Sequence, residues 1–363
     1  MSRGRAGALL LAAVAVLVAG GLAKLRPGPP DPVIVPSSAG PLATKDARIV
    51  DPRGRSVLLR GFNIIPIFDD PPGQTWGAGH YRRMRGLGLN VARFVLYWSD
   101  FEPSRGRFDE QRLATLDTAI ARAREAGMYV VLDLVHLYEG ETYVPSWARR
   151  GDALTDVARE AGPYLAMMAR RYRDEPAVAA YDPVNEPATT PIDQDRVLRT
   201  YDGLIRTIRR EDPEKVVMIE PSFGDSDLRT ANFDLLSDRR NLVLSVHDYY
   251  AGGAGDGYGP GLEQRGSYAW DGTSGYPSAS KADLKAHMTA YLEPASEAGL
   301  AVWVGELGID PGAPNAERWV RDKTALLEEQ GLGFAWWVYR PGPGLDALEP
   351  DLSLKPLVER ALR

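Results

Sequence analysis

Residues 177–187 of the chain read AVAAYDPVNEP, and residues 301–307 read AVWVGEL. Each stretch is a nearly continuous apolar run that leads into a glutamate, Glu186 in the first and Glu306 in the second. Apolar runs without polar alternation are typical of strands in a parallel sheet that is buried on both faces. A glutamate directly behind such a run is costly to bury unless it has a partner or a chemical role.

Further apolar runs flank these two, and segments with helical periodicity separate them. Between two of the runs, Asp109 is placed to cap a helix that carries Leu113, Leu116 and Ile120 on one face and ends at Gly127. Because parallel neighbours need crossover helices, the alternation predicts a single (β/α)8 barrel, an α/β fold, over residues 45–363. The expected strands are 58–64, 90–96, 129–136, 177–185, 216–220, 242–249, 301–307 and 333–339.

An open, doubly wound sheet is the alternative arrangement. Such sheets usually carry a glycine-rich turn after the first strand, but here residues 66–70 read PIFDD, and the chain has no P-loop. Nucleotide binding is therefore unsupported. Before the first barrel strand we expect a short hairpin that pairs residues 47–50 with 56–59 around Asp51-Pro52-Arg53-Gly54.

The N-terminal segment differs from the rest of the chain. Arg3 and Arg5 precede an apolar run over residues 6–23, and a proline-rich stretch follows. This is the pattern of a secretory signal, although the run is also just long enough for a membrane anchor. We expect a signal peptide or signal anchor over 1–26, a linker over 27–44 and a body that is secreted or extracytoplasmic, with membrane attachment through residues 6–23 as the alternative to cleavage.

Composition excludes several classes of chemistry. The chain of 363 residues has no cysteine, so thiol nucleophiles, thiolate metal sites and disulfides are ruled out. Removing the four basic residues of the first 26 from the net charge of −6 leaves about −10, which is the opposite of a nucleic-acid-binding footprint. No cofactor or metal is expected, and we expect a monomer.

Polar residues that end the expected strands are the candidates for a site, because barrel chemistry lies at the carboxyl ends of the strands. Arg93 lies inside a buried strand and needs an acidic partner. Glu186 and Glu306 end strands four and seven, across the barrel mouth from each other, as the paired carboxylates of glycosidic-bond hydrolysis would. The candidates are Asn63, Arg93, His136, Asn185, Glu186, Glu220, His247, Tyr249, Glu306 and one of Trp336 and Trp337.

The chain also resembles a known family. Asn185-Glu186-Pro187 and Gly305-Glu306-Leu307-Gly308 look like the acid/base and nucleophile motifs of glycoside hydrolase family 5, a clan A family of retaining β-glycosidases. The similarity continues through DPRGRSVLLRGFNI (51–64), GLNVARFVLYWSDFEPSRGRFDE (88–110), GMYVVLDLVH (127–136), VHDYY (246–250), FAWWVYR (334–340) and DLSLKPLV (351–358).

The resemblance implies a role for each matching residue. Glu186 would be the general acid/base and Glu306 the nucleophile. Arg93 would keep Glu306 ionised, Tyr249 would donate to Glu306, and His247 would lie beside Glu186. Asn185 and His136 would bind sugar hydroxyls. Because neighbouring strand residues face opposite ways, only one of Trp336 and Trp337 can stack under the sugar, and the resemblance favours Trp337, since family strands of this kind often end in an aromatic residue just before the final loop.

The substrate class stays open at this point. A β-glucan or β-mannan type of glycan is the first expectation, and IEPSFG (219–224) with HDYY (247–250) also resembles the endoglycoceramidase branch, which acts on glycolipids. A sugar-binding barrel that has lost catalysis is the alternative from another class. Aromatic residues in the loops, as candidates for distal sugar subsites, are Trp76, Trp98, Trp147 and Trp270.

Overall fold

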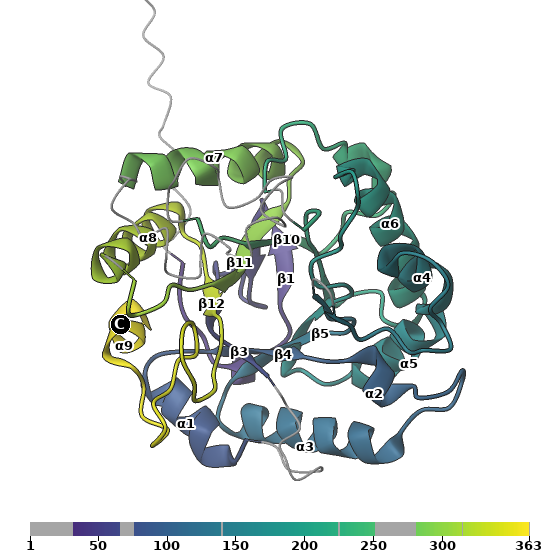
Figure 1. Cartoon of the computed structure of the whole chain (residues 1–363), viewed down its shortest axis with the longest axis horizontal. Helices are drawn as coiled ribbons and strands as arrows, with labels where there is room; N and C mark the ends of the chain where they lie inside the picture. The colour runs from purple at the N-terminus through teal and green to yellow at the C-terminus, as the bar shows by residue number, and fades with distance from the viewer. Residues whose placement is uncertain are drawn as a thin grey trace, which may run out of the picture. The chain divides into compact units, whose positions relative to one another are not determined.

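The computed structural model describes residues 32–65, 76–138, 141–223, 226–250, 281–313 and 315–362. In these ranges eight parallel strands close into a barrel, in the order β10-β11-β12-β3-β4-β5-β8-β9 (Figure 1). Each expected strand contains one of them, so the (β/α)8 barrel is confirmed and the open sheet is wrong. The strands are β3 (Arg60–Ile64), β4 (Val91–Val95), β5 (Tyr129–Asp133), β8 (Val178–Asp182), β9 (Val216–Ile219), β10 (Leu242–His247), β11 (Ala301–Leu307) and β12 (Phe334–Trp336).

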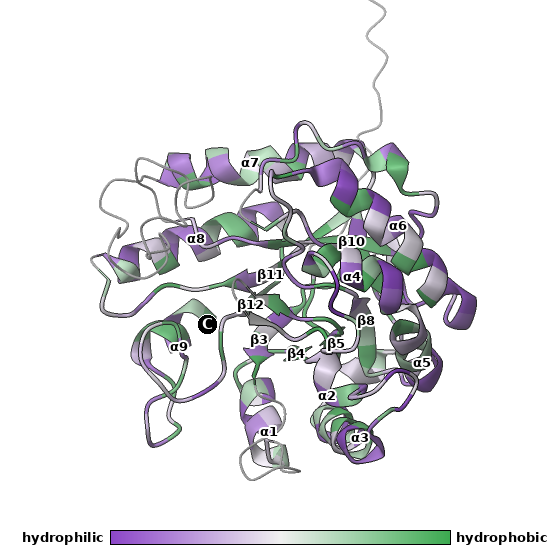
Figure 2. Cartoon of the chain, turned by 45° about the vertical axis from the view of Figure 1, so that its right-hand side comes forward, coloured by the Kyte–Doolittle hydropathy of each residue, from purple (hydrophilic) through white to green (hydrophobic). Residues whose placement is uncertain are grey.

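Helices surround the strands (Figure 1). The Asp109 side chain accepts the backbone N–H of Arg112 at the start of α3, and Gly127, with φ +76°, follows its end, as the sequence predicts. The longer helices carry both hydrophobic and hydrophilic residues, as helices with one face on a sheet do (Figure 2). They are α1 (Ala78–Gly86), α2 (Trp98–Phe101), α3 (Glu110–Glu125), α4 (Ala153–Glu160), α5 (Gly162–Tyr172), α6 (Gln194–Glu211), α7 (Lys281–Glu297), α8 (Ala316–Gln330) and α9 (Pro356–Leu362).

Among the described residues, no helix has the length and hydropathy needed to cross a membrane. The expected signal or anchor over residues 1–26 lies outside the described residues.

The hairpin before the barrel differs in part from the prediction. β2 (Arg48–Val50) pairs with β1 (Ala43–Lys45) through a tight turn at Asp46 and Ala47, both of which have positive φ. The predicted partner segment 56–59 also pairs with β2, through a bridge between Val50 and Ser56 and a hydrogen bond from the Val57 N–H to the Ile49 carbonyl at 2.8 Å, so the prediction is confirmed in part and the pairing with β1 is the addition. The Pro-Gly turn was visible in the sequence, whereas the turn at Asp46 contains no glycine or proline to mark it.

Apolar side chains fill one end of the barrel. Leu42 and Ile49 from the hairpin region join Val243, Trp303 and Ala335 from the strands in one buried cluster. A larger cluster lies between the strands and the helices. The polar residues that end the strands are therefore left at the carboxyl end, where barrel active sites are built.

Close strand contacts predict a sharp cost for enlarging Gly61 in β3. A Cβ atom there would lie 1.7 Å from the carbonyl oxygen of Val91, so Gly61→Ala must push two barrel strands apart. We expect the free energy of unfolding to fall by about 1–3 kcal/mol or more. The control is Gly203→Ala in α6, where no atom lies within 4 Å and alanine should add about 0.5–1 kcal/mol. Urea unfolding measures both, and equal effects would contradict the packing account.

Candidate active site

Arg93 is the buried charge around which the polar end of the barrel is arranged. It lies in β4, is fully buried, and needs compensation for the loss of water. Burial by itself would lower the pKa of Arg93, but the surrounding carboxylates outweigh it and raise that pKa well above the ordinary value. The sequence prediction of acidic partners is confirmed. The guanidinium donates at 2.8–3.0 Å to Asn63, Asp182, Asn185, Glu220 and Glu306.

Glu306 is aimed into the site by an irregularity in β11. The pairing of β10 with β11 shifts between Val246 and His247, which leaves Gly305 as an extra residue and sets His247 opposite Glu306. Bulges of this kind re-aim side chains beside active sites. A Cβ atom on Gly305 would lie 2.3 Å from Ser245 Oγ, so a larger residue there would have to displace the Ser245 side chain. Glu306 accepts from Arg93 Nη1 and from the Tyr249 hydroxyl, both at 2.8 Å.

Glu186 follows β8 and adopts a left-handed backbone conformation, with φ +48°. For a residue other than glycine this conformation costs about 1–3 kcal/mol and persists only where the surroundings fix it. Its N–H donates to Glu220 Oε2 at 2.7 Å, and Glu220 in turn accepts from Arg93. The backbone strain and the buried acceptor together turn the Glu186 side chain toward the barrel mouth, where it is 12% exposed.

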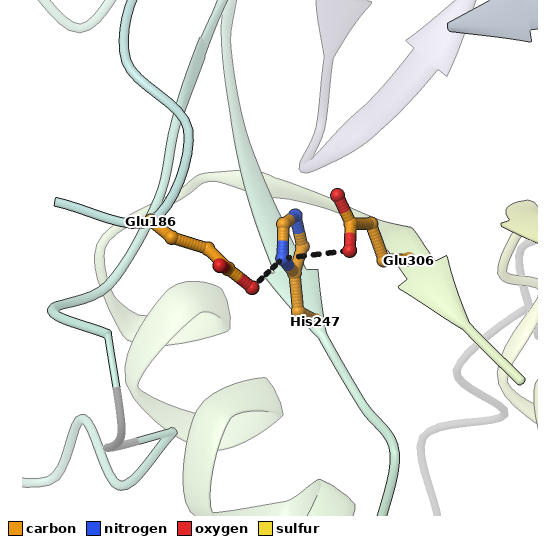
Figure 3. A group of neighbouring side chains, drawn as sticks. All are labelled: Glu186, His247 and Glu306. Carbon is orange, nitrogen blue, oxygen red and sulfur yellow. Dashed lines mark hydrogen bonds and ion pairs between the residues drawn. The ribbon is translucent and has the colours of Figure 1, made fainter. Parts of the chain in front are cut away.

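His247 lies between the two glutamates (Figure 3). Its Nδ1 is 2.9 Å from Glu186 Oε1 and 3.4 Å from Glu306 Oε2, while Nε2 is 3.2 Å from Glu220 Oε1. Burial would lower the pKa of His247, but Glu220 and Glu306 outweigh it and raise that pKa well above its ordinary value. The neighbouring carboxylates therefore favour the imidazolium form of His247.

The positions of Glu186, His247 and Glu306 are also close enough to hold a metal ion. One ligand atom from each lies within 4.8 Å of the others. In its imidazolium form, His247 itself places a positive charge between the two carboxylates.

The charge state of Glu306 depends on opposing influences. Burial has the largest influence and raises the pKa of Glu306 to about 7, and the proximity of Glu186 acts in the same direction. Arg93 and His247 lower the pKa, as expected of cations, but they do not overcome burial. Arg93 therefore favours the ionised form of Glu306, as the resemblance implies, while burial opposes it.

Three predicted sugar-binding residues line the same region. His136 Nδ1 lies 2.7 Å from Asp133 Oδ2, and its ring stacks parallel to Trp337, with ring centroids 6.0 Å apart. Trp337 is partly exposed, whereas Trp336 is buried and donates its indole N–H to the Leu345 carbonyl. This arrangement supports Trp337 over Trp336 as the tryptophan that faces the mouth.

Asn185 is held at both ends of its amide. Its Oδ1 accepts from Arg93 Nη2 at 2.8 Å, and its Nδ2 donates to the Leu137 carbonyl at 2.8 Å. Its contact with a sugar hydroxyl stays a prediction.

The four tryptophans expected at distal subsites differ in their burial and contacts. Trp98 is fully buried and donates to Glu102 Oε2, so its assignment as a sugar platform is wrong. Trp147 is partly exposed, and the Arg105 guanidinium covers its ring at 4.8 Å. Trp76 packs edge-on against Tyr339, with ring centroids 5.3 Å apart. Trp270 lies outside the described residues.

Sequence reasoning missed two acids of the site. Asp133 and Asp182 end β5 and β8 side by side, both fully buried, and Arg93 Nη2 approaches them at 3.5 and 2.9 Å. The signal was present, because each aspartate interrupts an apolar run as Arg93 does. It was overlooked because each lies three residues before a more conspicuous polar residue, His136 or Asn185.

A second omission is a pair of tyrosines beside His136. The rings of Tyr97 and Tyr143 stack with centroids 3.6 Å apart, and the Tyr97 ring lies 5.9 Å from that of His136. Tyr143 follows the short strand pair β6 (Leu137–Tyr138) and β7 (Glu141–Thr142). Nothing in the local sequence pattern brings these two tyrosines together.

A closed (β/α)8 barrel with facing carboxylates, an imidazolium and a buried guanidinium at the carboxyl ends of its strands has the form of a glycosidase active site. Residues 50–342 match the family model described as cellulase (glycosyl hydrolase family 5). The chain therefore belongs to glycoside hydrolase family 5, as its motifs suggest.

Similar proteins carry several glycosidase names. A β-xylosidase of Phanerodontia chrysosporium is 24% identical over 70% of this chain and 54% of its own length, and endoglucanase 5 of Pectobacterium carotovorum subsp. carotovorum is 26% identical over 59% and 38%. The chain thus spans about half or less of the length of these relatives.

Solved structures give the same fold. An endogalactoceramidase superposes with a TM-score of 0.68 at 22% identity, covering 89% of this chain and 84% of its own. Endo-glycoceramidase II from Rhodococcus sp. gives 0.69 at 20% identity, with coverage of 87% and 80%.

The crowding of carboxylates predicts that Arg93 is required for stability. Arg93→Met leaves Asp182, Glu220 and Glu306 without their shared cation, and breaking such a buried pair costs about 3–5 kcal/mol. The loss should be larger at pH 8 than at pH 5, because protonation of the carboxylates relieves their repulsion. Denaturant unfolding at the two pH values measures this. Arg170→Met, which breaks an exposed pair with Glu211, is the control and should change little; a similar loss in both variants would refute the account.

Proposed function

We propose that this family 5 protein hydrolyses a β-glycosidic bond with retention of anomeric configuration, using Glu306 as nucleophile and Glu186 as general acid and base. The observation that carries the proposal is the separation of the two carboxyl groups. One oxygen of Glu186 lies within 4.8 Å of one oxygen of Glu306, and His247 Nδ1 lies 2.9 Å and 3.4 Å from the two carboxyl groups. Retaining enzymes hold these groups about 5–5.5 Å apart, whereas inverting enzymes need about 6.5–9.5 Å for a water molecule.

In the first step, a carboxylate oxygen of Glu306 attacks the anomeric carbon while the bond from that carbon to the leaving oxygen breaks. Glu186 gives its proton to the leaving oxygen, and a covalent glycosyl ester forms on Glu306. The His247 imidazolium, 2.9 Å from Glu186 Oε1, stabilises the carboxylate that Glu186 becomes. Arg93 and Tyr249 hold the Glu306 carboxylate in place through their two hydrogen bonds.

In the second step, Glu186 takes a proton from water as the water oxygen attacks the anomeric carbon. The ester bond to Glu306 breaks and the sugar leaves with its original configuration, while Glu186 regains the proton that it needs for the next cycle. Arg93 and Tyr249 are again placed to stabilise the Glu306 carboxylate as it is released.

The proposed substrate is a β-linked glycan of β-glucan or β-mannan type. The relatives include endoglucanases, glucan 1,3-β-glucosidases and mannan endo-1,4-β-mannosidases, and the stacked Tyr97 and Tyr143 rings near His136 are suited to sugar faces. Export of the body, with or without anchoring through residues 6–23, is part of the same proposal.

Hydrolysis of glycolipids is the second candidate, favoured by the IEPSFG and HDYY motifs. A screen of the purified protein against aryl β-glycosides, polysaccharides and glycosphingolipids separates the two. Release of oligosaccharide from polysaccharide alone favours the glycan, and release from glycolipid alone favours the alternative.

A sugar-binding barrel without catalysis is the candidate from another class. Such a protein would be expected to have lost one of the glutamates or their supports, yet Glu306 accepts hydrogen bonds from Arg93 and Tyr249, and Glu186 is hydrogen-bonded to His247. Binding of a glycan with no turnover by the unaltered protein would identify this case.

The assigned roles predict different results for the two glutamates. Glu306→Ala should abolish turnover of every substrate while the thermal unfolding midpoint stays near that of the parent. Glu186→Gln should lose much more activity on natural leaving groups than on activated aryl glycosides, because the latter need little protonation. Initial rates on both substrate kinds measure the difference. A uniform loss in Glu186→Gln would argue against its role as acid, and an active Glu306→Ala would exclude it as nucleophile.

A further inference from the structure

A buried ion pair lies behind the site, outside the residues that the mechanism uses. Lys323 of α8 is fully buried, and its Nζ lies 2.7 Å from Oδ1 of the equally buried Asp248. Burial favours the neutral form of each group, and the partner charge opposes it. A buried ion pair gives little net stability compared with apolar packing of the same volume, so this pair points to a role in fixing geometry.

Asp248 is placed to fix that geometry because of its position in the chain. It lies between His247, which contacts Glu186, and Tyr249, which donates to Glu306. Since successive residues of an extended chain point to opposite faces, the Asp248 side chain points away from the site toward the outer helices. Its backbone N–H donates to the Glu306 carbonyl at 2.9 Å, which ties the segment to β11.

A second helix holds the same segment. The hydroxyl of Tyr291 in α7 donates to Asp248 Oδ2 at 2.8 Å, so the two carboxylate oxygens are held from two different helices. Next to it, the Tyr250 ring stacks on His287 of α7 with centroids 4.4 Å apart, and Trp319 of α8 donates to the Tyr250 carbonyl. Residues 248–250 are thus fastened to both helices.

We infer that Lys323, Asp248 and Tyr291 form an anchor that positions the Tyr249 hydroxyl on Glu306 and the His247 imidazole on Glu186. The inference rests on the proposed function, and it makes Lys323 a positioning residue that acts through Tyr249 and His247. The reason for its effect is geometric. A misplacement of about 1 Å caused by a change far from the chemistry can lower the rate about 100-fold.

The test is a double-mutant cycle between Lys323→Met and Tyr249→Phe. We expect Lys323→Met to lower kcat about 10- to 100-fold with little change in KM, because the anchor orders groups that act on the transition state. In the Tyr249→Phe background the same substitution should cost several-fold less, since the hydroxyl that it positions is already gone. Equal losses in both backgrounds would overturn the inference.

Two further variants separate positioning from general stability. Lys215→Met removes another buried lysine, which lies just before β9 and donates from Nζ to the carbonyls of Glu175 and Val178 near the start of β8, and it should leave kcat unchanged. Tyr291→Phe removes one hydrogen bond of the anchor without stranding a charge, so it keeps the test available if Lys323→Met does not fold. A loss of kcat in Lys215→Met as large as in Lys323→Met, or no loss in Tyr291→Phe when Lys323→Met is unfolded, would refute the anchor.

A spectroscopic readout distinguishes failure of the anchor from failure of the proposed function. The imidazole ¹⁵N resonances of His247, assigned by their absence in His247→Asn, should shift in Lys323→Met or Tyr291→Phe and not in Lys215→Met. If the unaltered protein hydrolyses no glycoside, the proposed function fails, and these resonances alone decide the anchor. Unchanged His247 resonances in the anchor variants would overturn it.

Discussion

The contact between the Arg93 guanidinium and the carboxylates around it is the interaction on which the polar end of the barrel depends. A fully buried guanidinium has no water to accept its hydrogen bonds, and here its N–H groups donate to residues of β3, β8 and β11 and to Glu220, which follows β9. Through Glu306 the contact fixes the proposed nucleophile directly. Through Glu220, which accepts the Glu186 N–H and lies beside His247, it also fixes the proposed acid.

The same cluster holds more carboxylates than cations, and this excess explains its protonation. Arg93 and His247 face Asp133, Asp182, Glu186, Glu220 and Glu306. Burial would keep Glu220 neutral, yet His247 and Arg93 lower the pKa of Glu220 to about 2. Burial and the negative charge of Glu220 raise the pKa of the neighbouring Asp182 well above its ordinary value. Protonation is therefore favoured at some of these carboxyl groups, and it reduces the repulsion on the carboxylates that stay ionised in the absence of water.

The barrel could be predicted from the sequence because a strand that is buried on both faces has a nearly continuous apolar sequence. The runs that contain β10 and β11 are largely apolar, and each polar residue within or behind such a run, Arg93 above all, needs a partner. The additional strand β1 could not be predicted, because the turn at Asp46 and Ala47 depends on positive φ angles at residues that are not glycine. The burial of Trp98 could not be foreseen either, since it depends on packing with residues distant in the chain, such as Trp147 and Tyr164. The pKa of Glu306 is a sum over burial and several neighbours, and sequence gives only the sign of each contribution.

The most direct measurement of the central claim is the configuration of the sugar when it is first released. The purified protein is mixed with an aryl β-glycoside or a β-glycan that it hydrolyses, and ¹H NMR spectra are recorded before mutarotation equilibrates the anomers. The carboxylate separation of Glu186 and Glu306 predicts that the β-anomer appears first. Initial appearance of the α-anomer would show inversion and would contradict a covalent intermediate on Glu306.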